Sequence, residues 1–267
     1  MSTFPGTAEF YRQFRPGLPG ALPTLLDQIA PAASPRRLLD IGTGPGLVVE
    51  ALLERFDDIV ALDSDASMVA VAESALRTPL PHGSRLQLHH GRAEEFTPSA
   101  GWQPHLVTFC RVFHWLDQSA VLARLGEYVA PEGVVAVFSD RSLWTAGNPW
   151  QRAVRDVVQD FLGTQRRAGN RTFESPGPPH TQVLRDSPFS EVTETVIPVR
   201  RTWSADDVIG YLYSTSFAAP YLFGGRRANF EAAVKTVLAH FTTNGVLLEN
   251  NAFTVLTAHR PSRHGKR

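Results

Sequence analysis

The sequence contains a single cysteine, Cys110, among its 267 residues. A disulfide framework is therefore excluded, and a metal cluster held by thiolates is not expected. No apolar run reaches the length that spans a bilayer. The first residues carry neither the basic nor the apolar region of a signal peptide. We therefore expect a soluble cytoplasmic protein.

The sequence also lacks a surplus of charge of either sign. Its 26 basic and 26 acidic residues give a formal net charge of zero. Proteins that bind nucleic acid or an anionic membrane typically carry a basic surplus. We expect neither partner. The composition leaves the choice between a monomer and a homodimer open.

Glycines are concentrated in one stretch. An apolar strand over 37–41 runs into Gly42-Thr43-Gly44-Pro45-Gly46, and a helix is predicted over 46–56. Three glycines within five residues allow positive φ angles and a close approach of the backbone to a ligand. The helix presents free N–H groups to the same ligand. Asp40 ends the strand, where its carboxylate can accept hydrogen bonds from a polar or cationic ligand group.

The spacing of these glycines limits the ligand class. The dinucleotide fingerprint is G-x-G-x-x-G, whereas Gly42, Gly44 and Gly46 form G-x-G-x-G. This difference weakens a nicotinamide or flavin reading without removing it. A phosphate-binding P-loop needs a lysine followed by serine or threonine, and Leu47-Val48 follow Gly46 instead. The turn therefore indicates a nucleotide-like ligand but does not identify which one.

Beyond the turn, strands and helices alternate as in right-handed parallel βαβ units. We predict strands over 59–62, 85–90, 105–110 and 134–138, and helices over 64–76 and 116–129. Asp63 follows the second strand, about one βαβ step past the glycines. In dinucleotide-binding folds a carboxylate at that place binds ribose hydroxyls.

The second half of the chain has a different pattern. The spacing of its apolar residues predicts an amphipathic helix over 150–162. Residues 163–180 form a long loop, which is typical of a functional lid or of a disordered segment. We further predict strands over 191–201 and 253–258, and helices over 205–216 and 228–241.

Two other patterns have more than one interpretation. Tyr11 and Arg15 lie on a segment that forms either a helix packed on the surface or a flap over the glycine turn. His89 and His90 are adjacent in a predicted strand, so they point to opposite faces and do not easily reach one ion. Since no third ligand has metal-site spacing, we expect no metal.

These motifs together resemble the class I S-adenosylmethionine-dependent methyltransferases, in particular their small-molecule type 11 branch. The matching segments are Leu39–Gly46, Val60–Asp63, the G-x-A-E turn Gly91–Glu94, the aromatic segment His114–Asp117, the P-x-G turn Pro131–Gly133 and the lid-like segment Tyr11–Pro16. Two positions depart from the family pattern. Arg92 replaces a common acidic residue, so adenine recognition depends on Ala93 and Glu94, and His105 replaces a common aspartate.

The resemblance implies an α/β fold with a Rossmann-like, mostly parallel seven-stranded sheet. Its last strand is expected to be antiparallel, with helices on both faces and a helical cap or lid. One methyltransferase domain would span residues 1–267. Its parts would be an N-terminal lid and helix (1–31), a cofactor-binding core (36–140), cap elements interleaved with the sixth strand (141–230), and the last helix and strand (231–260).

The resemblance also implies S-adenosyl-L-methionine as the cofactor and S-adenosyl-L-homocysteine as its product. The implied cofactor-binding residues are Tyr11, Arg15, Asp40, Gly42, Gly44, Gly46, Asp63, Ser64, Met68, Ala93, Glu94 and Arg111. Trp115, Trp144 and Tyr213 are the candidate substrate-binding residues.

A hydroxyl acceptor needs a general base, and His114 is the first candidate because it follows the fourth strand at the ligand edge of the sheet. The alternative is that His114 only shapes the wall of the pocket. Tyr11, Tyr213 and His180 are weaker candidates. Cys110 ends a buried strand, where a cysteine is more often a small apolar residue than a nucleophile.

The predicted function is methyl transfer to a small molecule, with a bulky or aromatic, natural-product-like acceptor that is methylated on oxygen or nitrogen. The alternative is an enzyme of the same fold that catalyses a non-methylating reaction such as cyclisation. A nucleic-acid methyltransferase is opposed by the zero net charge. A nicotinamide oxidoreductase fits least.

Overall fold

The computed structural model describes residues 8–77, 80, 83–165, 167–168, 171–172 and 177–262. The chain divides into two compact units. The sheet unit comprises Leu18–Ser139, Pro176–Ile197 and Thr254–Arg267. The helical unit comprises Met1–Gly17, Asp140–Ser175 and Pro198–Phe253. A single methyltransferase domain over residues 1–267 stays a prediction.

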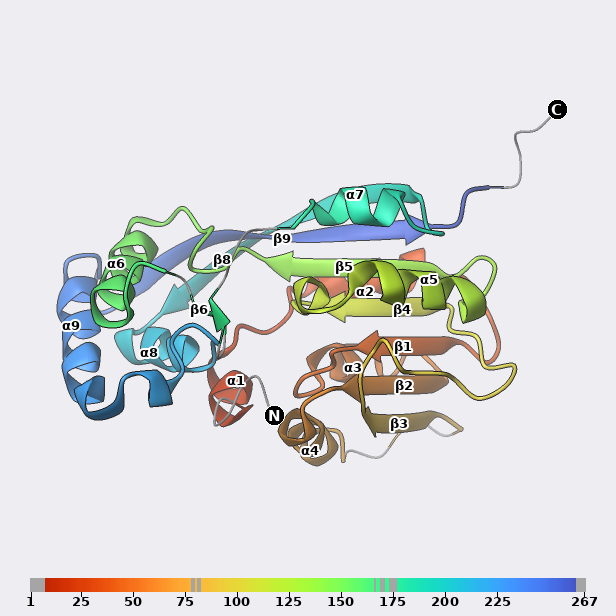
Figure 1. Ribbon diagram of the computed structural model, residues 1–267, viewed down its shortest axis with the longest axis horizontal. Coiled ribbons are helices and arrows are strands. Elements are labelled where there is room, and N and C mark those ends of the chain that lie inside the picture. Colours follow the sequence, from red (N-terminus) through yellow and green to blue (C-terminus); the bar gives the residue numbers. More distant parts are fainter. Residues whose placement is uncertain are drawn as a thin grey trace. The chain divides into compact units, whose positions relative to one another are not determined.

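A seven-stranded sheet has the strand order β3-β2-β1-β4-β5-β9-β8 (Figure 1). The strands are β1 Arg37–Ile41, β2 Asp58–Asp63, β3 Arg85–His90, β4 Leu106–Cys110, β5 Val134–Asp140, β8 Glu191–Trp203 and β9 Leu247–His259. The neighbours from β3 to β5 pair in parallel, and β9 is antiparallel. This mixed, Rossmann-like sheet confirms the predicted fold class.

The composition of each strand explains its place inside the sheet or at its edge. Strands β2 and β4 consist mostly of buried residues, as does β1 after its first residue. Continuous apolar strands of this kind occur where both faces of a parallel sheet are covered. Strand β3 lies at the edge of the sheet and alternates between exposed and half-buried residues along most of its length.

The sheet unit carries short helices before and between its strands. These are α2 Ala21–Ile29, α3 Leu47–Leu52, α4 Ala66–Ala75, the 3₁₀ helix η1 Phe113–Trp115, α5 Gln118–Tyr128 and α7 His180–Arg185. Two of them begin at aspartate caps. The Asp65 carboxylate accepts a hydrogen bond from the backbone N–H of Ser67, and that of Asp117 accepts one from Ala120.

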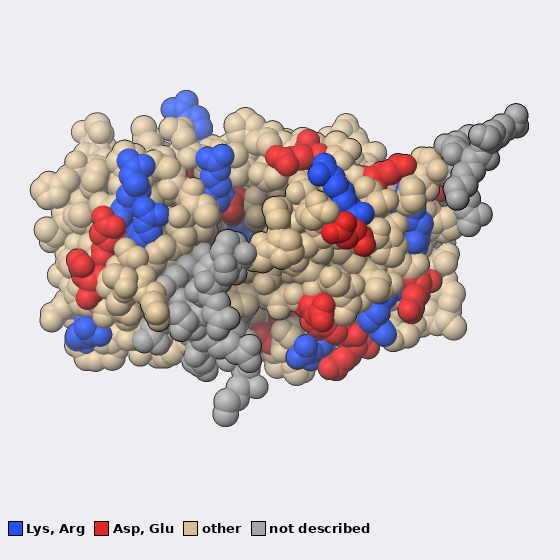
Figure 2. Space-filling model, turned by 45° about the horizontal axis from the view of Figure 1, so that its top comes forward, with Lys and Arg blue, Asp and Glu red and all other residues tan. Residues whose placement is uncertain are grey.

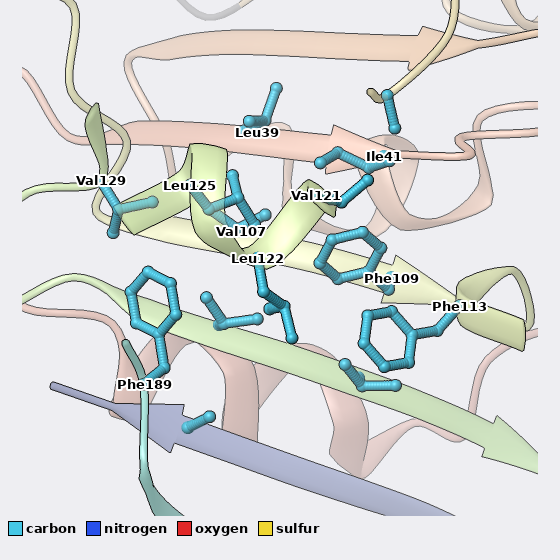
Figure 3. Close-up of a cluster of buried hydrophobic side chains, with 14 of the residues drawn as sticks. Leu39, Ile41, Val107, Phe109, Phe113, Val121, Leu122, Leu125, Val129 and Phe189 are labelled. Atoms are coloured by element: carbon cyan, nitrogen blue, oxygen red, sulfur yellow. The ribbon is translucent and has the colours of Figure 1, made fainter. Parts of the chain in front are cut away.

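One hydrophobic cluster of the sheet unit gathers apolar side chains from β1, β4 and α5, with Phe113 and Phe189 beside them (Figure 3). Phe109 and Phe113 meet edge to face, with 5.1 Å between their ring centroids. Since Phe113 begins the turn after β4, the core itself fixes the start of that turn.

The helical unit has its own core. Its elements are α1 Ala8–Phe14, α6 Pro149–Leu162, the two-residue strands β6 Arg167–Ala168 and β7 Arg171–Thr172, α8 Ala205–Tyr213, the 3₁₀ helices η2 Pro220–Leu222 and η3 Gly224–Arg226, and α9 Arg227–Ala239. Ser204 and Asp207 form a capping box at the start of α8. Apolar side chains of α6, α8 and α9 pack together, as shown by the buried Val154, Leu212 and Phe230.

Several predicted boundaries need correction. The helix predicted over 46–56 ends at Leu52, and β9 begins at Leu247, well before residue 253. The long loop predicted over 163–180 contains the short pair β6–β7, and α7 begins at its last residue, His180. Residues 166, 169–170 and 173–176 of that loop lie outside the described residues. Periodicity missed these elements because they are short.

The visible surface carries both signs of charge. Figure 2 shows Lys and Arg side chains interspersed with Asp and Glu on the face drawn there. Within the described part of the chain, no helix is both long enough and apolar enough to cross a membrane.

Candidate functional site

The turn after β1 has a left-handed backbone at all three glycines. Their φ angles are +69° at Gly42, +54° at Gly44 and +89° at Gly46. Residues with a Cβ rarely adopt this conformation, which explains the glycine-rich composition of the turn. Gly46 is also the cap of α3, and its carbonyl accepts a hydrogen bond from Glu50.

The three glycines differ in what lies beside them. A Cβ on Gly42 would lie 2.4 Å from a methyl carbon of Val112, and one on Gly46 would lie 2.9 Å from Leu76 Cδ1. A Cβ on Gly44 would meet nothing within 4 Å. Packing within the protein therefore needs Gly42 and Gly46, whereas Gly44 presents the open side of the turn, where a ligand can approach the backbone.

Asp63, at the end of β2, holds this turn. Its Oδ2 accepts a hydrogen bond from the Gly44 N–H (2.8 Å), and its Oδ1 accepts one from the Asp65 N–H (2.9 Å). Burial raises the pKa of Asp63, and these backbone donors oppose that shift. A carboxylate has about four lone-pair positions, so two bonds leave capacity for ribose hydroxyls.

Asp40 is only 1% exposed and contacts the neighbouring strand. Its Oδ1 accepts a 2.6 Å hydrogen bond from the Thr108 hydroxyl on β4. Burial raises the pKa of Asp40 to about 6, against the effect of the Thr108 and Thr43 hydroxyls. Its Oδ2 is buried and accepts no hydrogen bond of regular geometry from the described residues. Asp40 therefore ties β1 to β4 and retains one oxygen for a bound donor.

The predicted adenine turn is tied to the segment that follows β4. Glu94 Oε1 accepts a hydrogen bond from the Asp117 N–H (3.1 Å), and its Oε2 lies 3.5 Å from Arg92 Nε. The side chain of Ala93 lies in the hydrophobic core of the sheet unit. Ala93 can therefore contribute to an adenine site through its backbone alone.

The remaining cofactor candidates of the sheet unit lie at the same edge of the sheet, because the parallel strands end there. Ser64 is exposed directly after β2, and Met68 is buried in the first turns of α4. Arg111 follows β4 with φ +59°, and its N–H donates to the Phe138 carbonyl (3.0 Å). A residue with a Cβ at positive φ is uncommon and frequently marks a functional turn.

His114 and Trp115 are presented to solvent by the 3₁₀ turn after β4. His114 is exposed, Trp115 is 40% exposed, and their rings lie 5.2 Å apart. Gln118 Nε2 donates to the Phe113 carbonyl and so holds the turn from the α5 side. The exposed imidazole can meet a ligand, as the sequence prediction requires.

His180 lies on the other side of this turn. Its ring contacts Phe113 edge to face, with 5.1 Å between the centroids. Burial lowers the pKa of His180 and so favours the neutral form of its imidazole. This contact makes His180 a packing residue of the turn. Periodicity could not detect it, because α7 is only six residues long.

Four predicted site residues, Tyr11, Arg15, Trp144 and Tyr213, belong to the helical unit. The Arg15 guanidinium lies over the rings of Tyr11 and Tyr211, and Trp144 meets Phe217 edge to face. Cofactor contacts by Tyr11 and Arg15, and a substrate contact by Trp144, stay predictions.

Tyr213 does not have the environment expected of a substrate-binding residue. It is 1% exposed, and its hydroxyl donates to Glu231 Oε1 (2.8 Å). Burial, followed by this bond to the carboxylate, raises the pKa of its phenol far above the usual range. Its ring is part of the core of the helical unit. These contacts give the substrate-binding role of Tyr213 no support.

The adjacent histidines of β3 have separate surroundings. The His89 ring contacts Phe96, whereas His90 Nε2 lies 3.2 Å from the Ser64 carbonyl. Nowhere in the described ranges do three His, Cys, Asp or Glu side chains gather as they would around a metal ion.

These observations fit S-adenosylmethionine. A left-handed turn open at Gly44, a carboxylate at Asp63 and a buried acceptor on Asp40 suit a ligand that has ribose hydroxyls and cationic groups. The turn between Gly91 and Glu94 follows β3, which pairs with β2.

Comparison with known proteins also indicates a methyltransferase. A methyltransferase domain profile matches residues 39–135. An uncharacterised methyltransferase of Mycobacterium tuberculosis is 32% identical over 182 residues, which are 68% of this chain and 63% of the relative. The match therefore spans less than two thirds of that relative's length. The trans-aconitate 2-methyltransferase of Yersinia pestis is 28% identical over 227 residues, 80% of each chain.

The fold also has counterparts among solved structures. A candidate type II methyltransferase from Anaeromyxobacter dehalogenans superposes with a TM-score of 0.59 at 20% identity. The superposition covers 92% of this chain and 98% of that one. Fold, glycine turn and sequence matches agree, and the chain belongs to the class I S-adenosylmethionine-dependent methyltransferases.

Proposed function

We propose that this protein transfers a methyl group from S-adenosylmethionine to a small-molecule acceptor. The observation that carries the proposal is the glycine turn, which is open on the side of Gly44 and held by the carboxylate of Asp63. Asp63 would bind the ribose, and the backbone of Ala93 and the residue Glu94 would face the adenine. Ser64, Met68, Arg111, Tyr11 and Arg15 complete the proposed cofactor contacts.

When bound, S-adenosylmethionine would supply an electrophilic methyl carbon: an acceptor lone pair would form the new bond to it as the carbon–sulfur bond breaks in line, and S-adenosylhomocysteine would leave with that electron pair. The protein then has to align the two groups, and alignment can lower such a barrier by roughly 7–11 kcal/mol. The glycines with left-handed backbone and the hydrogen-bonded carboxylates of Asp63 and Asp40 form a rigid support for this alignment. An oxygen acceptor additionally has to lose a proton.

His114 is the proposed base for that proton. It is the exposed imidazole of the turn after β4, and a buried core residue, Phe113, fixes the start of that turn. The variant His114→Gln keeps a polar side chain without a basic ring. We expect it to lower kcat by about 10²-fold or more and to leave the affinity for S-adenosylmethionine unchanged. A kcat close to that of the wild type would reduce His114 to a residue of the pocket wall.

The proposed acceptor is bulky or aromatic and is methylated on oxygen or nitrogen. Trp115 supports this proposal, because an exposed indole beside His114 offers an aromatic surface. Trp144 and Phe217 form a second aromatic pair in the helical unit, with ring centroids 5.3 Å apart.

A carboxylate acceptor is the second candidate. It is supported by the relatives named trans-aconitate 2-methyltransferase and by the charge of the helical unit. That unit contains thirteen arginines and lysines against nine aspartates and glutamates. A surplus of positive charge attracts anionic substrates.

Turnover assays with the purified full-length protein test the proposal. Each assay contains S-adenosylmethionine and one acceptor class, either aromatic hydroxyl and amine compounds or di- and tricarboxylates that include trans-aconitate. S-Adenosylhomocysteine that forms together with a methylated acceptor supports methyl transfer, and the acceptor class decides between the two candidates. Conversion of an acceptor with S-adenosylmethionine left intact would contradict methyl transfer and support a cyclase-like reaction. We further propose a cytoplasmic location and a monomeric or homodimeric state.

A further inference from the structure

The N-terminal helix α1 packs on α8 within the helical unit, at the position of Gly210. A Cβ on Gly210 would lie 2.2 Å from Phe14 Cγ and 2.4 Å from its two δ carbons. The Phe14 ring therefore occupies the space that any other residue at position 210 would fill. Glycine is the least favourable residue in a helix interior apart from proline. The glycine in the middle of α8 is therefore explained by the space that the Phe14 ring needs.

A second aromatic residue completes the apolar face of α1. Phe10 lies one helical turn before Phe14, and their rings are stacked with 6.1 Å between the centroids. The Phe10 ring also meets Tyr213 edge to face at 5.4 Å. Tyr213 is itself fixed, because its hydroxyl donates to Glu231 on α9. The apolar face of α1 thus packs on a rigid part of the helical unit.

Tyr11 lies on α1, and Arg15 follows the helix directly. The Arg15 N–H donates to the Tyr11 carbonyl (3.1 Å), so the two residues are also one turn apart. The Arg15 guanidinium carbon lies 4.8 Å from the Tyr11 ring centroid and 5.1 Å from that of Tyr211. Its Nη2 donates to the Ser214 carbonyl at 3.4 Å. The Nε of Arg15 is buried and has no hydrogen-bond partner among the residues that the structure describes. One donor of this arginine is therefore unused.

We infer that Gly210 and Tyr211 are positioning residues for Tyr11 and Arg15, and that α8 thereby sets the affinity for S-adenosylmethionine. Gly210 leaves room for the Phe14 ring, so that α1 can pack on α8, and Tyr211 contacts the Arg15 guanidinium as Tyr11 does. The inference rests on the proposed function, in which Tyr11 and Arg15 contact the cofactor.

The variant Gly210→Ala tests the seat for Phe14. The new methyl group displaces the Phe14 ring, so we expect the Kd for S-adenosylmethionine to rise about tenfold or more, with kcat at saturating cofactor retained. Alanine favours a helix more than glycine does, so α8 itself remains folded. Gly147→Ala is the matched control in the same unit, because a Cβ there meets nothing within 4 Å.

A rescue variant separates positioning from a general disturbance of the fold. Gly210→Ala combined with Phe14→Leu replaces the ring by a smaller side chain, and we expect it to recover most of the lost affinity. For Tyr211, the conservative Tyr211→Phe keeps the aromatic face over Arg15 and should bind the cofactor normally, whereas Tyr211→Ala should not. Unchanged affinity in both Gly210→Ala and Tyr211→Ala would overturn the inference.

Hydrogen exchange provides a readout that does not depend on activity. In Gly210→Ala the amides of residues 11–15 should exchange at least tenfold faster than in the wild type, whereas those of α9 should not change. If the protection of residues 11–15 were unaltered, the claim that Gly210 is needed for the packing of α1 on α8 would be wrong.

Two further variants keep failure of the inference distinct from failure of the proposed function. Tyr11→Ala and Arg15→Ala should each weaken binding of S-adenosylmethionine. Unchanged binding in both would remove their cofactor role and the inference with it, while the remainder of the proposed function stands. A wild-type protein that does not bind S-adenosylmethionine at all would instead overturn the proposed function itself.

Discussion

The carboxylate of Asp63 accepts a 2.8 Å hydrogen bond from the backbone N–H of Gly44. Gly44 follows β1, and Asp63 is the last residue of the neighbouring strand β2, so the bond ties the open side of the glycine turn to the proposed ribose site. The Asp63 carboxylate holds the turn and is also the proposed ribose ligand. The shape of the turn and the proposed ribose contact are therefore coupled at this residue. A change at Asp63 should therefore affect more than one ligand contact.

The variant Asp63→Asn tests this coupling. The amide retains one acceptor oxygen, but its NH₂ group faces a backbone N–H that was previously bonded. Loss of a hydrogen bond to a charged group costs about 1.5–3 kcal/mol, so we expect S-adenosylmethionine to bind about 10- to 100-fold more weakly by titration calorimetry. The exposed Asp156 on α6 provides the control variant Asp156→Asn. Equal affinities for the two variants would contradict the role of Asp63.

Gly42 and Gly44 should respond differently to alanine, although both have positive φ. Gly42→Ala places a methyl group against Val112 and should lower the free energy of unfolding by about 2–4 kcal/mol, from overpacking and backbone strain together. Gly44→Ala meets no protein atom within 4 Å. Its stability loss should therefore be only about 1–2 kcal/mol, from strain.

Cofactor affinity separates the two glycine variants further. Because the Gly44 side of the turn is open, its methyl group should obstruct the ligand, so S-adenosylmethionine should bind more weakly to folded Gly44→Ala than to the wild type. Urea denaturation and calorimetry measure the two quantities. If Gly44→Ala bound the cofactor as the wild type does, the open side of the turn would not be the ligand side.

Much of this site could be predicted from the sequence because its signals are local. The glycine spacing and an acidic residue one βαβ step later require only a strand, a turn and the next strand. The strands 37–41 and 85–90 agree with β1 and β3 for the same reason, since short runs bounded by turn residues define them.

The contacts that the sequence did not predict join distant residues. Thr108 is a polar residue in an apolar strand, which signals a buried hydrogen bond but does not identify Asp40 as its partner. The clash that keeps position 42 a glycine comes from Val112, 70 positions further along the chain. The burial of Tyr213 is not predictable from the sequence, because helical periodicity does not distinguish a core tyrosine from one that lines a pocket.

Asp40 predicts a pH dependence of stability. Its pKa in the folded protein is raised to about 6 from 3.8, so the folded state binds more protons than the unfolded state between these values. Stability should therefore fall as pH rises from about 4 to about 6, by on the order of 3 kcal/mol for this group. The variant Asp40→Asn should lose that slope in urea denaturation measured at several pH values. Asp156→Asn is the control. If Asp40→Asn kept the full dependence of the unfolding free energy on pH, other groups would be its source.

A buried carboxylate on β9, Glu249, anchors the helical unit. It is 3% exposed and accepts hydrogen bonds from Trp203 Nε1 (2.8 Å), Gln151 Nε2 (3.1 Å) and Asn251 Nδ2 (2.7 Å). Arg201 Nη1 lies 3.5 Å from Glu249 and 2.8 Å from Asp140 Oδ2. These side chains come from β5, β8, β9 and α6, so a single carboxylate links most of the strands and a helix of the unit.

The isosteric change Glu249→Gln should therefore destabilise the protein strongly. Each carboxylate oxygen accepts at least one N–H, so the amide NH₂ of glutamine must face a donor whichever way it is oriented. The change also removes one of the two negative charges beside Arg201. A buried donor without a partner and a weakened ion pair together should lower the free energy of unfolding by about 2–4 kcal/mol in urea titrations. Glu194→Gln on the exposed part of β8 should change it by less than about 0.5 kcal/mol. If the two variants were equally stable, the carboxylate of Glu249 would not be what holds these elements together.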